Sequence, residues 1–87
     1  MDFDRGRVVR SLAGRDNGFF VVIASDERGA VICDGRRRSL EHPKRKNPRH
    51  LSATGTVLPE DQMKTNREIR RALAPFGATG PLSRRGG

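Results

Sequence analysis

The sequence predicts a mainly β fold: a small five-stranded barrel over residues 5–58 with one short C-terminal α-helix packed on it. Hydrophobic residues make up 33% of the 87 residues and are concentrated between Phe19 and Cys33. Short apolar runs alternate with Gly, Asp and Asn, which is typical of strands joined by tight turns. Five such strands in about fifty residues cannot protect both faces of an open sheet, whereas a strongly bent barrel also removes exposed edges.

The first two strands are predicted at residues 7–11 and 19–24. The second strand has apolar residues on both faces, so it needs cover on both sides or a place at the centre of a tightly curled sheet. The loop between the two strands contains Gly14 and Gly18, which permit positive φ. This loop is therefore a hairpin connection that is somewhat longer than the minimal two residues.

Three further strands are predicted at residues 30–33, 38–41 and 51–57. Asp34-Gly35 is a strong tight-turn signal after the first of these strands. Leu40 is the clear core residue of the second, and residues 43–48, which begin and end with proline, are expected to be irregular. Gly55 indicates a bend or a bulge in the last strand.

A short helix is predicted near residues 66–75. Thr65 and Glu68 match a capping box, in which the hydroxyl of the first accepts a hydrogen bond from the amide of the second. A helix of this length is not stable alone, so it should dock on the barrel through the apolar face at i, i+4 and i+7. That face consists of Ile69, Leu73 and Phe76. Pro75 and Gly77 are expected to end the helix.

A chain of this length fits a single domain. The helical part, residues 59–76, is expected to be an extension of the barrel domain with Arg67, Arg70 and Arg71 pointing outward. Residues 77–87 have almost no hydrophobic side chains and are expected to form a disordered basic tail.

Charge indicates an anionic polymer as the partner. The chain has a formal net charge of +8 at pH 7 and a pI near 11.4. Seven of the fifteen residues 36–50 are Lys or Arg, and only Glu41 is acidic. Like charges at this density repel one another, and a polyphosphate neutralises them while releasing its condensed counterions. A merely solvated loop is the alternative, but the excess of positive charge extends over several connected segments.

Several other functions are not expected. No apolar run approaches the ~20 residues of a membrane-spanning helix, and the N-terminal residues lack the apolar region of a secretion signal. The single Cys33 excludes an intramolecular disulfide and fits a reducing compartment, with its side chain in the core. His42 and His50 lack metal-binding spacing, and no nucleotide-binding or hydrolase motif occurs. We expect a cytoplasmic protein without catalytic activity, metal or cofactor.

Residues 6–22 resemble the KOW motif. In that motif a strand beginning Gly-x-Val-Val leads through a glycine-bracketed loop into a second apolar strand, and this chain reads Gly6-Arg7-Val8-Val9 at the corresponding place. The similarity continues through the segments 33–36, 40–51 and 65–73. In this order the segments are similar to small bacterial KOW-domain RNA-binding proteins, which are related to KOW-containing large-subunit ribosomal proteins.

The resemblance implies a Src-homology-3-like (SH3-like) barrel with ribosomal RNA as its ligand. It also implies RNA contacts from the loop between the first two strands, namely from Arg15, Asp16 and Asn17, with the backbone shaped by Gly14 and Gly18. Many KOW loops carry Lys after the second glycine, whereas this chain has Phe19. The charge at that corner is reduced, so the basic segment at residues 36–50 should contribute more to binding.

The candidate RNA-binding residues are Arg15, Asn17, Arg36, Arg37, Arg38, Lys44, Arg45, Lys46, Arg49 and His50. The chain has four Phe and no Tyr or Trp, so recognition should depend on the backbone and shape of folded RNA rather than on base stacking. We expect a monomer that binds ribosomal RNA in translation or ribosome assembly, with ribosomal proteins as further partners. The alternatives are a protein-interaction adaptor and a transcription-linked KOW module that binds DNA, since charge alone does not separate the two nucleic acids.

Overall fold

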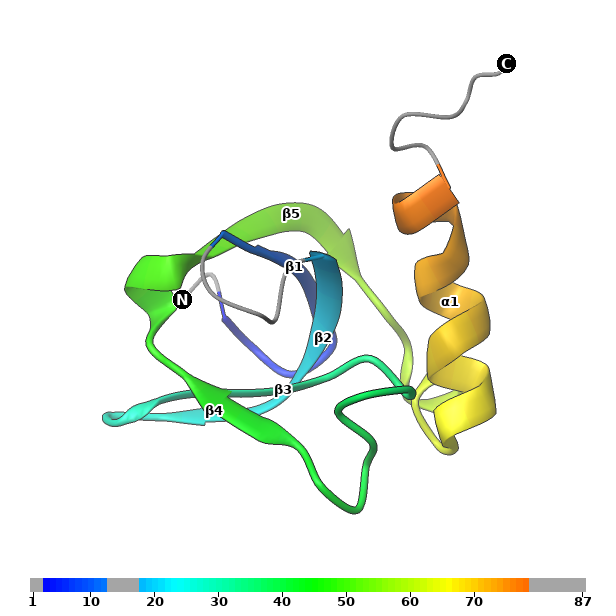
Figure 1. Cartoon of the computed structure of the whole chain (residues 1–87), viewed down its shortest axis with the longest axis horizontal. Coiled ribbons are helices and arrows are strands. Elements are labelled where there is room, and N and C mark those ends of the chain that lie inside the picture. The colour runs from blue at the N-terminus through cyan, green and yellow to red at the C-terminus, as the bar shows by residue number, and fades with distance from the viewer. Residues whose placement is uncertain (1–2, 13–17, 79–87) are drawn as a thin grey trace.

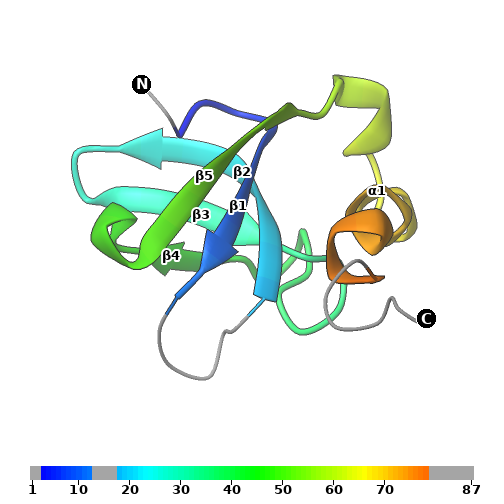
Figure 2. The same ribbon diagram turned by 90° about the horizontal axis from the view of Figure 1, so that it is seen from above.

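A five-stranded antiparallel sheet with the strand order β4-β3-β2-β1-β5 curls beside one helix, α1 (Figure 1; Figure 2). The computed structural model describes residues 3–12 and 18–78 of the chain. The strands are β1 Arg7–Ser11, β2 Gly18–Asp26, β3 Gly29–Cys33, β4 Lys44–Lys46 and β5 Leu51–Val57. The helical elements are the 3₁₀ turns η1 Pro48–His50 and η2 Glu60–Gln62 and the helix α1 Asn66–Ala78.

The central strand β2 alternates its side chains between two hydrophobic cores. Phe20 and Val22 lie in the inner core, which the curled sheet encloses. The other members of the inner core are Phe3, Val9, Ala30, Ile32 and Leu51. Val21 and its half-buried neighbours Phe19 and Ile23 lie in the outer core, between the sheet and α1. The prediction that this strand needs cover on both sides is confirmed.

The helix α1 supplies the cover for the outer core. Ile69 and Leu73 are buried there, and the ring of Phe76 lies 5.5 Å from the ring of Phe19. The sheet and the connection to α1 contribute Val8, Val21, Cys33, Leu58 and Met63. The predicted docking face of the helix is therefore confirmed. Burial raises the pKa of the Cys33 thiol to about 11, so this side chain acts as a small core hydrophobe, as predicted.

The start of α1 agrees with the prediction and its end does not. The amide of Glu68 donates a hydrogen bond to the Thr65 hydroxyl at 3.1 Å, which is the expected cap. The helix continues to Ala78 with Pro75 inside it, so the expectation that Pro75 and Gly77 end it is wrong. The contact of Phe76 with Phe19 stabilises the helix beyond Pro75. This stabilisation offsets the loss of one backbone hydrogen bond at the proline.

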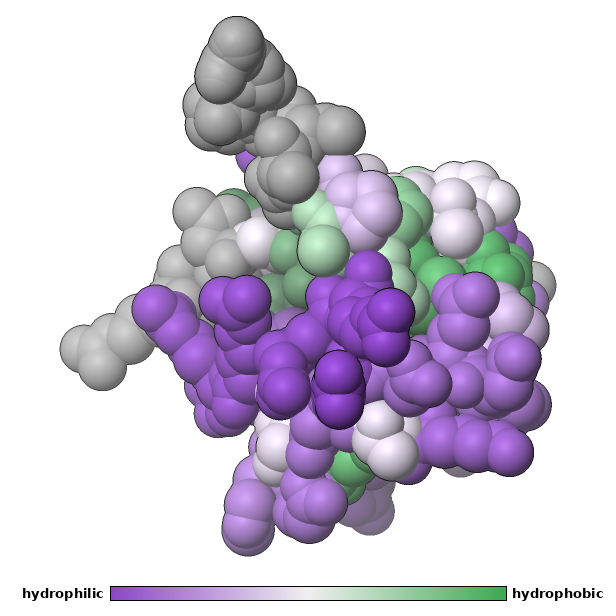
Figure 3. Space-filling view, turned by 90° about the vertical axis from the view of Figure 1, so that its right-hand side faces the viewer, coloured by the Kyte–Doolittle hydropathy of each residue, from purple (hydrophilic) through white to green (hydrophobic). Residues whose placement is uncertain are grey.

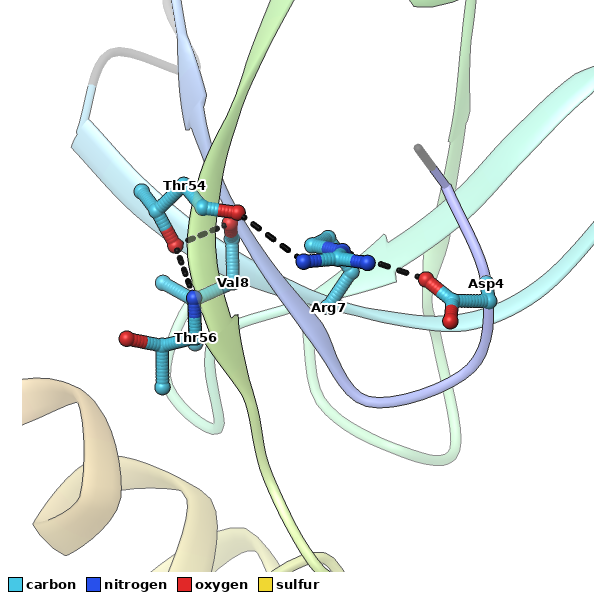
Figure 4. A network of polar contacts seen from close by, with 5 residues as sticks. All are labelled: Asp4, Arg7, Val8, Thr54 and Thr56. Atoms are coloured by element: carbon cyan, nitrogen blue, oxygen red, sulfur yellow. Dashed lines mark hydrogen bonds and ion pairs between the residues drawn. The ribbon is translucent and has the colours of Figure 1, made fainter. Parts of the chain in front are cut away.

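A bulge in β5 lies opposite Val8. The register between β1 and β5 shifts after Arg7, and residues 54–56 of β5 face the single residue Val8. The Thr54 hydroxyl donates to the Val8 carbonyl oxygen at 2.8 Å and accepts a hydrogen bond from the Thr56 amide at 3.2 Å (Figure 4). The irregularity predicted at Gly55 is therefore confirmed, and Thr54 satisfies backbone groups that the regular ladder leaves unpaired.

The predicted fourth strand, residues 38–41, is wrong. That segment belongs to the connection between β3 and β4, and the fourth strand is Lys44–Lys46, in the region that was expected to be irregular. Lys44–Lys46 pairs antiparallel with β3 at the edge of the sheet. Charged side chains are common on edge strands because they discourage pairing with another chain. Turn η1, which begins at Pro48, follows directly.

The fold class is therefore confirmed, with a mainly antiparallel β architecture and one C-terminal helix. Among the described residues no strand pairing joins β5 to β4, so closure of the sheet into an SH3-like barrel stays a prediction. Most of the predicted basic tail, residues 79–87, lies outside the described residues. In the part of the chain that the structure describes, no helix is both long and apolar enough to cross a membrane.

One arginine ties the N-terminal turn to the connection before α1. The Arg5 guanidinium donates to the Ile23 carbonyl oxygen at 2.7 Å and to both carboxylate oxygens of Glu60, at 2.6 and 3.0 Å. The hydrogen bonds from Arg5 hold the pKa of Glu60 below its usual range. Both side chains are more than half exposed, so solvent weakens this contact.

We expect Glu60→Gln to lower the free energy of unfolding at neutral pH by a small amount. Because the pKa of Glu60 is depressed in the folded state, its stabilising effect is fully present above the ordinary carboxyl pKa of about 4.3. The effect is lost as the pH falls through the depressed value. Urea unfolding should therefore separate the variant from the wild type at pH 7 and not at about pH 2. A difference that persists unchanged in acid would contradict this role.

Candidate nucleic-acid interface

The basic segment, residues 36–50, runs along the molecule instead of gathering at one point. It begins beside the start of α1, passes through the β3–β4 connection and β4, and reaches turn η1 (Figure 1). The helix and η1 lie at opposite ends of the longest axis in that view. The segment therefore forms a stripe that suits an extended polymer better than a small anion.

The first part of the stripe is a loop folded around Asp34. One carboxylate oxygen of Asp34 accepts hydrogen bonds from the amides of Arg36 and Arg38, at 2.9 and 3.0 Å. The Asp34 amide in turn donates to the Arg38 carbonyl oxygen at 2.8 Å. The Asp34 carboxylate is thus occupied with backbone donors, while Arg36 and Arg37 are exposed and Arg38 is half-buried.

The same loop is fixed to the first turns of α1. Arg70 donates to the Gly35 carbonyl oxygen at 2.8 Å. The Asn66 side chain accepts from the Leu40 amide at 2.8 Å and donates to the Glu41 carboxylate at 2.9 Å. The hydrogen bond from Asn66 is the main cause that lowers the pKa of Glu41. These contacts join segments that lie about thirty residues apart in the sequence, and they hold the loop in one conformation.

In the middle of the stripe, β4 places Arg45 against an acid. Its guanidinium forms an ion pair with Asp26 at 2.6 Å, and the same carboxylate oxygen accepts from the amides of Arg28 and Gly29. The pKa of Asp26 is lowered, first by the Arg28 amide and then by Arg45. Arg45 is therefore oriented and partly neutralised. Its neighbour Lys44 is exposed, and Lys46 is half-buried.

The last part of the stripe is the rigid turn η1. The Asn47 side chain accepts a hydrogen bond from the Arg49 amide at 2.9 Å, and Pro48 fixes the first position of the turn. The carbonyl oxygen of His50 accepts from the Leu12 amide at 2.9 Å, which joins η1 to the end of β1. Arg49 and His50 are both exposed, so this turn presents both side chains to solvent.

Several predicted residues fall outside the part of the chain that the structure describes. These residues are Gly14, Arg15, Asp16 and Asn17. Gly18 is described and has φ +129°, which agrees with the expected need for glycine there. The remaining predicted residues form the stripe, but its two ends are separated by the length of the molecule. Two contacts of the stripe were not predicted: the hydrogen bond from Arg70 to Gly35 and the ion pair of Arg45 with Asp26.

The chemistry of the stripe is electrostatic. No described Phe is exposed, because Phe20 is buried and Phe3, Phe19 and Phe76 are half-buried. Bases therefore find no exposed Phe, Tyr or Trp ring on which to stack within residues 3–12 and 18–78. In the same residues no three His, Cys, Asp or Glu side chains form a group that could hold a metal ion. Recognition of a nucleic acid by the stripe therefore depends on exposed cationic side chains on a fixed backbone.

No protein-family model matches the sequence, and a search of curated proteins finds no match. The resemblance to KOW-domain proteins stays a prediction.

We expect Gly35→Ala to destabilise the fold by about 1–3 kcal/mol. Gly35 has φ +79°, and an added Cβ would lie 2.4 Å from the Asn66 carbonyl oxygen. The matched control is Gly55→Ala, because a Cβ at Gly55 meets nothing within 4 Å, and its effect should stay within about 1 kcal/mol. Urea unfolding of both variants measures the difference. Equal stability of the two variants would contradict the close packing of this loop on α1.

Proposed function

We propose that this protein is a non-catalytic RNA-binding protein that holds the sugar-phosphate backbone of folded RNA along the basic segment. The proposal places it in the cytoplasm, on ribosomal RNA in translation or ribosome assembly, as the KOW resemblance implies. The observation that carries the proposal is the stripe of exposed cations on a backbone fixed at both ends. A fixed backbone loses little conformational entropy on binding, so several weak phosphate contacts can act together.

The hydrogen bonds and ion pair of the acidic side chains near the stripe support the same function. The carboxylates of Asp34 and Glu41 accept hydrogen bonds from backbone amides and from Asn66, so they are positioned as structural groups. Asp26 forms an ion pair with one cation of the stripe, Arg45. Arg36, Lys44 and Arg49 are exposed, so their positive charge is available to a polyanion, which gains from counterion release.

An adaptor that binds another protein through an apolar surface is less well supported. The exposed large hydrophobic residues of the described chain are Leu12 and Val57. Leu12 follows the last residue of β1, whereas Val57 ends β5 opposite Arg7, the first residue of β1. Single exposed apolar side chains are normal on a soluble surface. The exposed surface is thus better suited to an anionic polymer than to an apolar partner.

The direct test is a salt titration with Lys44→Gln/Arg45→Gln/Arg49→Gln. If the protein engages ~5 phosphates, the logarithm of affinity should fall with the logarithm of salt concentration at a slope of roughly −3 to −5. The triple variant should weaken binding to most RNAs alike and flatten the slope, with a nearly unchanged melting temperature, because these side chains are exposed. The control variant Lys44→Arg/Arg45→Lys/Arg49→Lys keeps the charge and should keep the slope. A wild-type slope near zero would refute the proposal.

The ion pair at Arg45 gives a second test with the opposite sign. Asp26 competes with phosphate for the Arg45 guanidinium, so Asp26→Asn should raise the affinity for RNA. The slope of log affinity against log salt should become steeper by less than the increment of about one phosphate contact. The Asn side chain can still accept hydrogen bonds from the Arg28 and Gly29 amides, so the turn should persist. Lower affinity in a correctly folded Asp26→Asn variant would mean that the ion pair orients Arg45 for binding rather than competing for it.

A further inference from the structure

We propose a second phosphate-binding surface on α1, the arginine cluster of Arg36, Arg67, Arg70 and Arg71, and a base-paired RNA as the ligand that spans it and the stripe. This inference rests on the proposed function and adds a surface to it. The sequence predicted only that the helix arginines Arg67, Arg70 and Arg71 point outward. The fold places them next to the first arginine of the stripe.

The cluster is assembled by contacts between the β3–β4 loop and α1. The guanidinium of Arg70 donates to the Gly35 carbonyl oxygen at 2.8 Å, and the Gly35 backbone packs against Asn66 and Arg70. Arg36 follows Gly35 directly in the chain, so its backbone starts beside the first turns of the helix. Arg70 is thus the positioning residue, and four donors of its guanidinium remain beyond the Nη1 contact with Gly35.

The other members of the cluster are exposed. Arg36, Arg67 and Arg71 all have exposed side chains, and within residues 3–12 and 18–78 no ion pair engages any of them. Figure 3 views the face that carries α1, and its darkest purple, the most hydrophilic surface, forms a continuous mass across the middle of this face. Arg36, Arg67 and Arg71 are therefore accessible to an anionic ligand.

The electrostatics of the cluster are unfavourable without a ligand. Arg67 and Arg71 are four residues apart on the helix, a spacing at which like charges repel. Arg67 also lies in the first turn of α1, where the helix dipole disfavours cations. Glu68 is the one acid in the first turn. A phosphate backbone would relieve this repulsion, whereas the packing of Ile69 and Leu73 already accounts for the stability of the helix.

The position of the cluster and the absence of exposed Phe, Tyr or Trp side chains among the described residues indicate the kind of ligand. The cluster extends the stripe at its α1 end, and turn η1 lies at the other end of the molecule (Figure 1). A base-paired stem offers two rows of phosphates and needs no stacking platform, because its bases are already stacked. A flexible single strand would instead depend on stacking on exposed aromatic side chains, and no Phe is exposed among the described residues.

The test compares two pairs of substitutions that each remove two charges. Arg67→Gln/Arg71→Gln alters the cluster, and Lys44→Gln/Arg49→Gln alters the stripe. Binding of each variant to a labelled RNA hairpin stem, and to the single strand that forms one side of it, is measured by fluorescence anisotropy across a salt series. The variant Arg67→Lys/Arg71→Lys keeps the charge. Circular dichroism melting confirms that all variants are folded.

We expect Arg67→Gln/Arg71→Gln to weaken binding to the stem by at least roughly five-fold and to flatten the salt slope by about 2. The Lys pair should bind like the wild type, and the wild type should prefer the stem to the single strand. If only Lys44→Gln/Arg49→Gln loses affinity, the cluster is not a contact surface and the proposed function stands. If neither pair of substitutions changes the affinity for RNA and the wild-type salt slope is near zero, both the proposed function and the second surface are refuted. Equal affinity for the single strand would overturn the assignment of a base-paired ligand.

Discussion

The burial of β2 on both faces is the constraint on which the structure depends. Phe20 and Val22 require an enclosed core on one face of the sheet, and Val21 requires a cover on the other. An open sheet of this size cannot provide both, so the sheet curls around the first face and α1 covers the second. Each fully buried aliphatic or aromatic side chain contributes about 1.5–3 kcal/mol, which is enough to hold a short helix that would not be stable alone.

The candidate interface follows from that arrangement. Because α1 must lie against β2, its first turns come next to the loop that leaves β3, and Asn66 and Arg70 hold the loop there. Because β4 pairs with β3 at the sheet edge, Lys44 and Arg45 stand at the border of the fold. The basic side chains are therefore carried by backbone that the core fixes in place, which lowers the entropy lost on binding.

The sequence predicted those features that depend on neighbouring residues. The strands β1, β2, β3 and β5, the capped start of α1 and the bulge at Gly55 all follow from local alternation, caps and glycine. The errors have long-range causes. Residues 38–41 were expected to form a strand, but the Leu40 amide bonds to Asn66, twenty-six residues away. Likewise, the arginine cluster and the pairing of Arg45 with Asp26 depend on which segments the fold brings together.

The most direct test of the account is an NMR titration of the full chain, labelled with ¹⁵N, with an RNA hairpin stem. A preformed surface on a fixed scaffold predicts that amide shifts change in residues 36–50 and around Arg67 and Arg71. The amides of the two cores, such as those of Val8 and Val22, should keep their shifts throughout. Changes that spread through the core, or that concentrate near Arg5 and Glu60 instead, would contradict the account.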